Sequence, residues 1–123
     1  MRNITNLLEK ADEALAVGLI KNGVIESGKV AAIADFGAVV INLDLLPALA
    51  VYENNHNDIV KALGKMVTGN ETGFFDYCKA QCSEARTKKE PAQQRLLKEK
   101  VIDASIALKI MARTYKIDPK DEQ

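Results

Sequence analysis

The feature that most constrains the fold of this chain is a long amphipathic pattern near its C-terminus. Apolar residues recur there in steps of four, three, four, three and four. Such steps place side chains on one side of an α-helix, whereas side chains of a β-strand alternate between two faces. The pattern predicts a final helix from roughly Pro91 to Tyr115, with the proline in the first turn, where its missing N–H costs no hydrogen bond. The side facing the core is formed by Leu97, Val101, Ala104, Leu108, Met111 and Tyr115.

Apolar periodicity predicts two helices in the first third of the chain. One runs from about Ile4 to Lys21 and ends at Asn22-Gly23, a usual helix stop. The second is a buried central helix within the almost entirely apolar segment from Val30 to Ile41. The β-branched residues 39–41 are also compatible with a buried strand. We favour a helix because no second strand candidate is available to pair with them.

Three further helices are predicted between residues 45 and 86. The first runs from Leu45 to about Glu53, with Asp44 as its cap and Pro47 in its first turn. Asn57 is placed to cap the next, whose apolar face is Ile59, Val60, Leu63, Met66 and Val67. A loop over residues 68–73 precedes a helix from Phe74 to about Arg86, which directs Phe74, Tyr77, Cys78 and Cys82 toward the core.

Length and composition support an all-α fold. The chain has 123 residues, of which 47% are hydrophobic, 28% charged and only 5% aromatic. We expect one domain, residues 1–123, built as a bundle of about five to six helices with a long C-terminal helix. No segment has the apolar length of a membrane helix or the character of a signal peptide, so we expect a cytoplasmic protein that does not associate with membranes.

Residues that could carry catalysis are few. The single histidine, His56, lies in a run of asparagines, where a solvated side chain is the more common role. Cys78 and Cys82 share one helix face and could donate two thiolates to a metal, but a closed zinc site needs four ligands, so core cysteines are favoured. Glycine-rich phosphate-binding motifs are absent. We therefore expect no enzyme, no metal and no cofactor.

The charge distribution is more informative than the net charge of zero. Residues 1–60 carry four basic and eight acidic side chains, whereas residues 61–123 carry thirteen basic and nine acidic ones. Residues 79–116 alone contain ten basic side chains against four acidic ones. An acidic first half and a basic second half are compatible with docking between copies and with a local basic face.

The final helix is predicted to carry part of that basic face. On a helical wheel, Arg95, Lys98, Lys109, Arg113 and Lys116 lie opposite the core-facing residues, with Ile102 and Ile106 between them. One interpretation is that a neighbouring helix covers the two isoleucines. The other is an interface, in which the isoleucines contact another protein and the cations bind phosphates or acidic side chains.

Two stretches resemble the small all-helical subunit of type III-B CRISPR effector complexes, the Cmr small subunit family. They are residues 35–41 followed by 45–52, DFGAVVI and LLPALAVY, and residues 106–115, IALKIMARTY. In that family a glycine commonly precedes the Leu-Leu-Pro-Ala-Leu segment, whereas this chain has Asp44. Aspartate tolerates the turn geometry less well but can cap the next helix.

The resemblance implies a non-catalytic subunit. Such subunits stack head to tail as a minor filament beside the crRNA-bearing backbone and help to hold the duplex of guide and target RNA. The implied partners are other effector subunits, further copies of the chain, and crRNA and target RNA through their phosphates. We expect the RNA-backbone contacts at Lys61, Lys65, Lys98, Lys109, Arg113 and Lys116, and a protein interface at Ile102 and Ile106.

Two other functions are compatible with the residues. The chain could be a free-standing helical interaction module or small regulator that forms a dimer through Ile102 and Ile106. It could also be an enzyme that uses His56 or the two thiols, which is the weakest of the three hypotheses.

Overall fold

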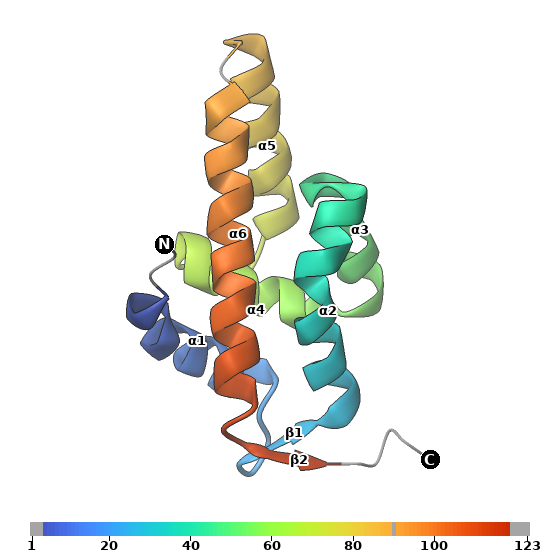
Figure 1. Ribbon diagram of the computed structural model, residues 1–123, viewed down its shortest axis with the longest axis vertical. Helices are drawn as coiled ribbons and strands as arrows, with labels where there is room; N and C mark the ends of the chain where they lie inside the picture. The colour runs from blue at the N-terminus through green and yellow to red at the C-terminus, as the bar shows by residue number, and fades with distance from the viewer. Residues whose placement is uncertain (1–3, 90, 119–123) are drawn as a thin grey trace.

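The computed structural model describes residues 4–89 and 91–118, and within them it confirms an all-α bundle with a long C-terminal helix. Six helices and two short strands are present in this part of the chain (Figure 1). The helices are α1 (Thr5–Gly18), α2 (Ser27–Leu43), α3 (Leu45–Asn55), α4 (Asn57–Thr68), α5 (Phe74–Thr87) and α6 (Pro91–Ala112). The strands are β1 (Val24–Glu26) and β2 (Lys116–Asp118).

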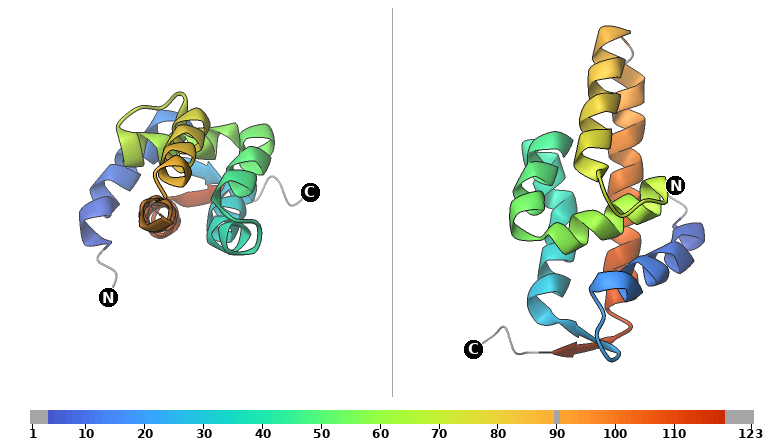
Figure 2. Two further views of the ribbon diagram at one scale, coloured as in Figure 1. Left: turned by 90° about the horizontal axis from the view of Figure 1, so that it is seen from above. Right: turned by 180° about the vertical axis from the view of Figure 1, so that it is seen from behind.

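Helix α6 is the central element of the bundle, and it packs against α1, α2, α4 and α5. Figure 1 shows α6 running the height of the molecule, with α5 beside its first half and α2 and α3 to one side. Seen from behind in Figure 2, α4 crosses α6 between the level of α5 and the level of α1. The far end of the α5–α6 hairpin therefore extends past the rest of the bundle.

The core contains residues from all six helices. Leu15, Phe36, Leu49 and Leu63 are completely buried, and Cys78 and Leu108 bring α5 and α6 into the same cluster. The apolar face predicted for residues 59–67 is confirmed, since only Val67 in it is half-buried and the others are buried. The ring of Phe36 meets the ring of Tyr52 edge to face, with centroids 5.0 Å apart. Residues 39–41 lie within α2, which confirms a helix there and excludes the strand interpretation.

Helix α2 ends and α3 begins at Asp44. The backbone of this residue has φ 73° and ψ 170°, a conformation that is essentially restricted to glycine. Its Oδ1 accepts a 2.9 Å hydrogen bond from the N–H of Leu45, so the predicted capping role is confirmed. Pro47 lies in the first turn of α3 and Pro91 opens α6, as their missing N–H groups predict.

Two strands that sequence patterns did not predict form a small parallel sheet. Val24, Ile25 and Glu26 pair with Lys116, Ile117 and Asp118 in that order. They explain why the end helices are shorter than predicted. Helix α1 ends at Gly18 instead of Lys21 because Lys21 turns back to form an antiparallel bridge with Val24. Helix α6 ends at Ala112 instead of Tyr115 because the chain must turn into β2.

Two local predictions are wrong. Asn57 is not the cap of α4: His56 occupies that position, and the Asn57 side chain donates instead to Glu53 Oε1 at 3.0 Å. Tyr77 does not face the core, because 40% of it is exposed. Its ring stacks on that of Phe74, with centroids 6.2 Å apart, so the outer side of α5 carries an aromatic residue that periodicity placed inside.

Candidate nucleic-acid interface

The buried side of α6 packs in the core and so fixes the position of the basic residues on its other side. Leu97, Val101, Ala104 and Leu108 are buried, which confirms the predicted seam, while Met111 and Tyr115 are half-buried against the core. The Tyr115 hydroxyl donates a hydrogen bond to Asp12 Oδ1 of α1. This bond raises the pKa of Tyr115 and joins the turn after α6 to the first helix.

The basic residues at the end of α6 do not form one continuous helical stripe. Lys109 lies on α6 and is half-buried, whereas Arg113 is exposed in the turn after the helix ends at Ala112. Lys116 is exposed in β2, opposite Val24. The stripe predicted on a helix reaching Tyr115 is therefore wrong in its last turn, although the three cations stay close in the sequence and at the same end of the molecule.

Lys98 has a partner within the molecule. Its Nζ lies 3.3 Å from Oδ1 of Asp44, so this lysine joins α6 to the corner between α2 and α3. The hydrogen bond from the Leu45 N–H is the largest cause that lowers the pKa of Asp44, and Lys98 lowers it further. Asp44 is therefore ionised at neutral pH and Lys98 is partly neutralised by it.

Ile102 and Ile106 are both half-buried, but in different surroundings. Ile102 packs against the core cluster, as expected if a neighbouring part of the chain covers it. Ile106 does not belong to the set of partly buried residues packed on that cluster. One helical turn further on, 42% of Ile110 is exposed. The exposed large apolar residues of α6 are therefore Leu96, which is 57% exposed, and Ile110, while Ile106 is half-buried. Sequence reasoning missed Leu96 and Ile110 because it assigned them to neither face of the helix.

Lys61 and Lys65 lie on a different surface from the α6 cations. Both are on α4, where they line a cavity of about 230 Å³ together with Val17 of α1. Asp58 and Glu71 line the same cavity, so these lysines face carboxylates as well as solvent. The six cations predicted to meet RNA thus fall into three groups: the α4 pair, Lys98 beside Asp44, and the three at the end of α6.

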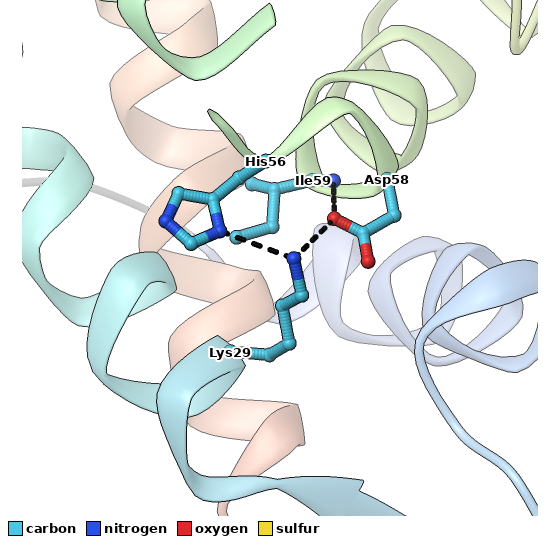
Figure 3. A network of polar contacts seen from close by, with 4 residues as sticks. All are labelled: Lys29, His56, Asp58 and Ile59. Atoms are coloured by element: carbon cyan, nitrogen blue, oxygen red, sulfur yellow. Dashed lines mark hydrogen bonds and ion pairs between the residues drawn. The ribbon is translucent and has the colours of Figure 1, made fainter. Parts of the chain in front are cut away.

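A polar cluster that the sequence did not reveal joins α2 to the start of α4. Lys29 Nζ lies 3.0 Å from Asp58 Oδ1 and 3.1 Å from His56 Nδ1. Figure 3 shows the Lys29 side chain between these two residues. Asp58 Oδ1 also accepts a 2.9 Å hydrogen bond from the N–H of Ile59. Because an ammonium group only donates, Nδ1 of His56 must accept, which places the proton of the neutral ring on Nε2.

The environment of His56 favours its neutral form. Burial is the largest cause that lowers its pKa, and the nearby Lys29 ammonium lowers it further, while Asp58 acts in the opposite direction. The predicted solvated position is therefore incorrect, since the ring is half-buried and in contact with Lys29. Lys29 comes from 27 residues earlier in the chain, and no local motif connects the two.

The two cysteines lie where a packing role predicts. Cys78 is completely buried and Cys82 half-buried, and both are free thiols. Burial raises the pKa of the Cys78 thiol to about 12 and also raises that of Cys82. Within residues 4–89 and 91–118, no three histidine, cysteine or carboxylate side chains gather closely enough to hold a metal ion.

None of the helices described here combines the length and apolar character needed to cross a bilayer. The chain matches no protein-family model, and comparisons with curated proteins and with solved structures likewise find no match.

Proposed function

We propose that the chain is a non-catalytic small subunit of a type III-B CRISPR effector complex, acting in the cytoplasm in antiviral defence. In this role it stacks with further copies of itself as part of the minor filament and contacts other effector subunits. It also helps to hold crRNA and target RNA through their phosphates, without reading bases. Cutting and signalling belong to other subunits.

The observation that carries this proposal is the backbone at Asp44. The resemblance to the Cmr small subunit family places a glycine at this position, directly before the Leu-Leu-Pro-Ala-Leu segment. The backbone there has φ 73° and ψ 170°, which glycine adopts far more readily than other residues. The chain thus keeps a glycine-type corner between α2 and α3 although the residue is aspartate, and this supports the resemblance at a position where the residue type departs from the family.

The charges support contact with phosphates. We propose Lys109, Arg113 and Lys116 as the principal RNA contacts, because they are close in sequence at one end of α6. Lys61 and Lys65 of α4 are a second, separate set. Lys98 is the weakest member of the predicted group, since Asp44 already lies 3.3 Å from its ammonium.

Affinity purification from the native cell tests the subunit role. A tagged chain should recover crRNA together with other effector subunits. Recovery of neither would overturn the proposal. Lys79→Ala is the matched control variant, because Lys79 is exposed and pairs with Asp76 at 3.4 Å outside the proposed RNA contacts. It should recover the same components as the wild-type chain.

RNA contact has a separate test in the reconstituted effector complex. Log affinity should fall with log salt concentration, and each lost phosphate contact should reduce that slope by about 0.7. We expect Lys109→Ala and Arg113→Ala each to reduce the slope and to weaken binding of unrelated RNA sequences alike. The Lys79→Ala complex should keep the wild-type slope. An unchanged slope in both interface variants would exclude these cations as RNA contacts.

A second candidate function is a free-standing module that forms a homodimer through the outer side of α6. The observation that favours it is Ile110, which is 42% exposed one turn after Ile106. Sedimentation of the purified chain distinguishes the candidates. A stable dimer that Ile106→Asp dissociates, together with no salt-dependent affinity for RNA, would support this module and contradict the effector subunit.

A further inference from the structure

A groove of about 550 Å³ separates the corner between α2 and α3 from the α5–α6 hairpin. Residues 43–47 form one wall, and the other contains Cys82 and Arg86 of α5 and four residues of α6 between Pro91 and Lys98. In Figure 1 the α5–α6 hairpin rises past the end of α2, beside the corner between α2 and α3. The volume is within the range of ordinary ligand-binding clefts.

Two polar contacts hold this groove in its shape. The ion pair of Asp44 with Lys98 joins one wall to the other. Within the hairpin, the Gln94 side chain donates a 3.0 Å hydrogen bond to the carbonyl oxygen of Cys82, which fixes α5 against α6. A site whose walls are already positioned loses little conformational freedom when a ligand enters. The groove is thus preformed.

Six of the eleven residues that line the groove are apolar. Leu43 is 48% exposed, Pro47 and Pro91 are exposed, and Leu46 and Cys82 are half-buried. Exposed apolar side chains gathered in a concave site are typical of a surface that another molecule covers. They require a ligand with apolar side chains of its own.

The rim of the groove carries uncompensated positive charge. Arg86 and Arg95 are exposed and line it from α5 and α6, and neither forms an ion pair with another residue of 4–89 and 91–118. Lys98 differs, because Asp44 balances its charge. Guanidinium groups bind carboxylates through two parallel hydrogen bonds, so two free arginines beside an apolar floor are complementary to an acidic, partly apolar peptide.

The same lining is poorly suited to RNA. It contains no aromatic side chain on which a base could stack. We infer that the groove binds a short acidic segment of a partner protein, with leucine-like side chains against Leu43 and Leu46 and carboxylates on Arg86 and Arg95. This binding needs neither RNA nor the cations at the end of α6.

Fluorescence anisotropy with the full chain at low salt tests this inference. The probe is a short fluorescein-labelled peptide of glutamate and alanine with two leucines one helical turn apart. Matched peptides replace glutamate by glutamine, or leucine by serine. We expect saturable binding of the acidic peptide with Kd below about 1 mM, and markedly weaker binding of both matched peptides. All groove residues changed below are substantially exposed, so the variants should remain folded.

Variants of the lining residues test whether the peptide binds in the groove. The double variant Arg86→Ala/Arg95→Ala should weaken peptide binding roughly tenfold, and Leu43→Ser about fivefold. Lys100→Ala is the control, because Lys100 is exposed on α6 and does not line the groove, and it should change Kd by less than about twofold.

Three results would overturn the inference. The first is no binding of the acidic peptide up to about 1 mM. The second is an equal loss of affinity in the Lys100→Ala control and in the double arginine variant. The third is displacement of the peptide by oligouridylate RNA whose own binding needs Arg86 and Arg95, which would assign the groove to RNA. None of these results bears on Lys109 or Arg113, so the proposed subunit role is judged separately.

Discussion

The hydroxyl of Tyr52 donates a 2.7 Å hydrogen bond to the carbonyl oxygen of Ala32, which joins α3 to α2 inside the core. Burial is the largest cause that raises the pKa of Tyr52, and nearby Asp35 raises it further, so the hydroxyl stays protonated and available as a donor. The same ring packs edge to face on Phe36. One side chain thus fixes the angle between two helices by both polar and aromatic contact.

We expect Tyr52→Phe to lower the free energy of unfolding by about 1 kcal/mol, because the ring contact stays while the buried hydrogen bond is lost. Urea denaturation measures the change. Tyr77→Phe is the control: Tyr77 is 40% exposed, and its replacement should change stability by less than about 0.5 kcal/mol. Equal effects of the two variants would show that the Ala32 contact contributes nothing.

Gly64 allows α4 to lie close to the start of α5. A Cβ at this position would be 2.8 Å from Cβ of Phe74 and 3.0 Å from the carbonyl oxygen of Asn70. Gly64→Ala should therefore lower the free energy of unfolding by about 1–3 kcal/mol through overpacking. Gly37→Ala, inside α2, adds a Cβ with no atom within 4 Å apart from its chain neighbours and the adjacent α2 backbone, and it should raise the free energy of unfolding by about 0.5–1 kcal/mol. Thermal melts should move in opposite directions for the two variants.

The strained backbone at Asp44 predicts that a glycine variant is more stable than an alanine variant. Asp44→Ala keeps the positive φ and loses both the hydrogen bond from Leu45 and the Lys98 ion pair, so stability should fall by about 1–3 kcal/mol. Asp44→Gly loses the same contacts but removes the backbone strain, and it should be the more stable of the two variants. Chemical denaturation of both proteins would contradict this account if the alanine variant were equally stable.

His56 should make stability depend on pH. Its pKa in the folded chain is below the ordinary value of 6.5, so the unfolded chain binds a proton more readily. The free energy of unfolding should therefore fall as pH decreases below about 6.5. In His56→Gln the free energy of unfolding should decrease less between about pH 7 and pH 5, since glutamine does not titrate. Parallel pH profiles for the two proteins would show that His56 is not responsible.

The thiols should differ in their rates of alkylation. Cys78 is completely buried, and burial raises its pKa to about 12, so almost no thiolate forms near pH 8. Its reaction with iodoacetamide should require unfolding of the chain. Half-buried Cys82 should react faster, as mass spectrometry of the time course would show. Cys82→Ser gives a chain with Cys78 alone, and rapid labelling of that chain would contradict the buried position.

Sequence patterns predicted the helices well because each signal is local. Asp44, Pro47 and Pro91 act within a turn of their own positions, and the apolar seam of α6 follows directly from the helical repeat. The ends of α1 and α6 could not be predicted in this way. They depend on pairing between Val24 and Lys116, and strands of three residues carry too few side chains to show a pattern.

The candidate interface was harder to predict than the fold. Residue type identified the cations, but it did not show that Asp44, far away in the sequence, pairs with Lys98. The contact of Lys29 with His56 is likewise non-local, and no sequence pattern indicated it. A helical wheel also treats Arg113 and Lys116 as helical positions, whereas both follow the end of α6. The groove beside Leu43 depends on how the α5–α6 hairpin leaves the bundle, which no single segment encodes.

The small parallel sheet has a consequence for the order of folding. Val24 and Lys116 are 92 positions apart, and α2 to α6 all lie between them. Closing so long a segment is entropically costly until those helices have packed, so we expect the strands to pair late and to separate early. Amide hydrogens of residues 24–26 and 116–118 should then exchange faster than those of buried α6, which places the weakest point of the bundle at the pairing of β1 with β2.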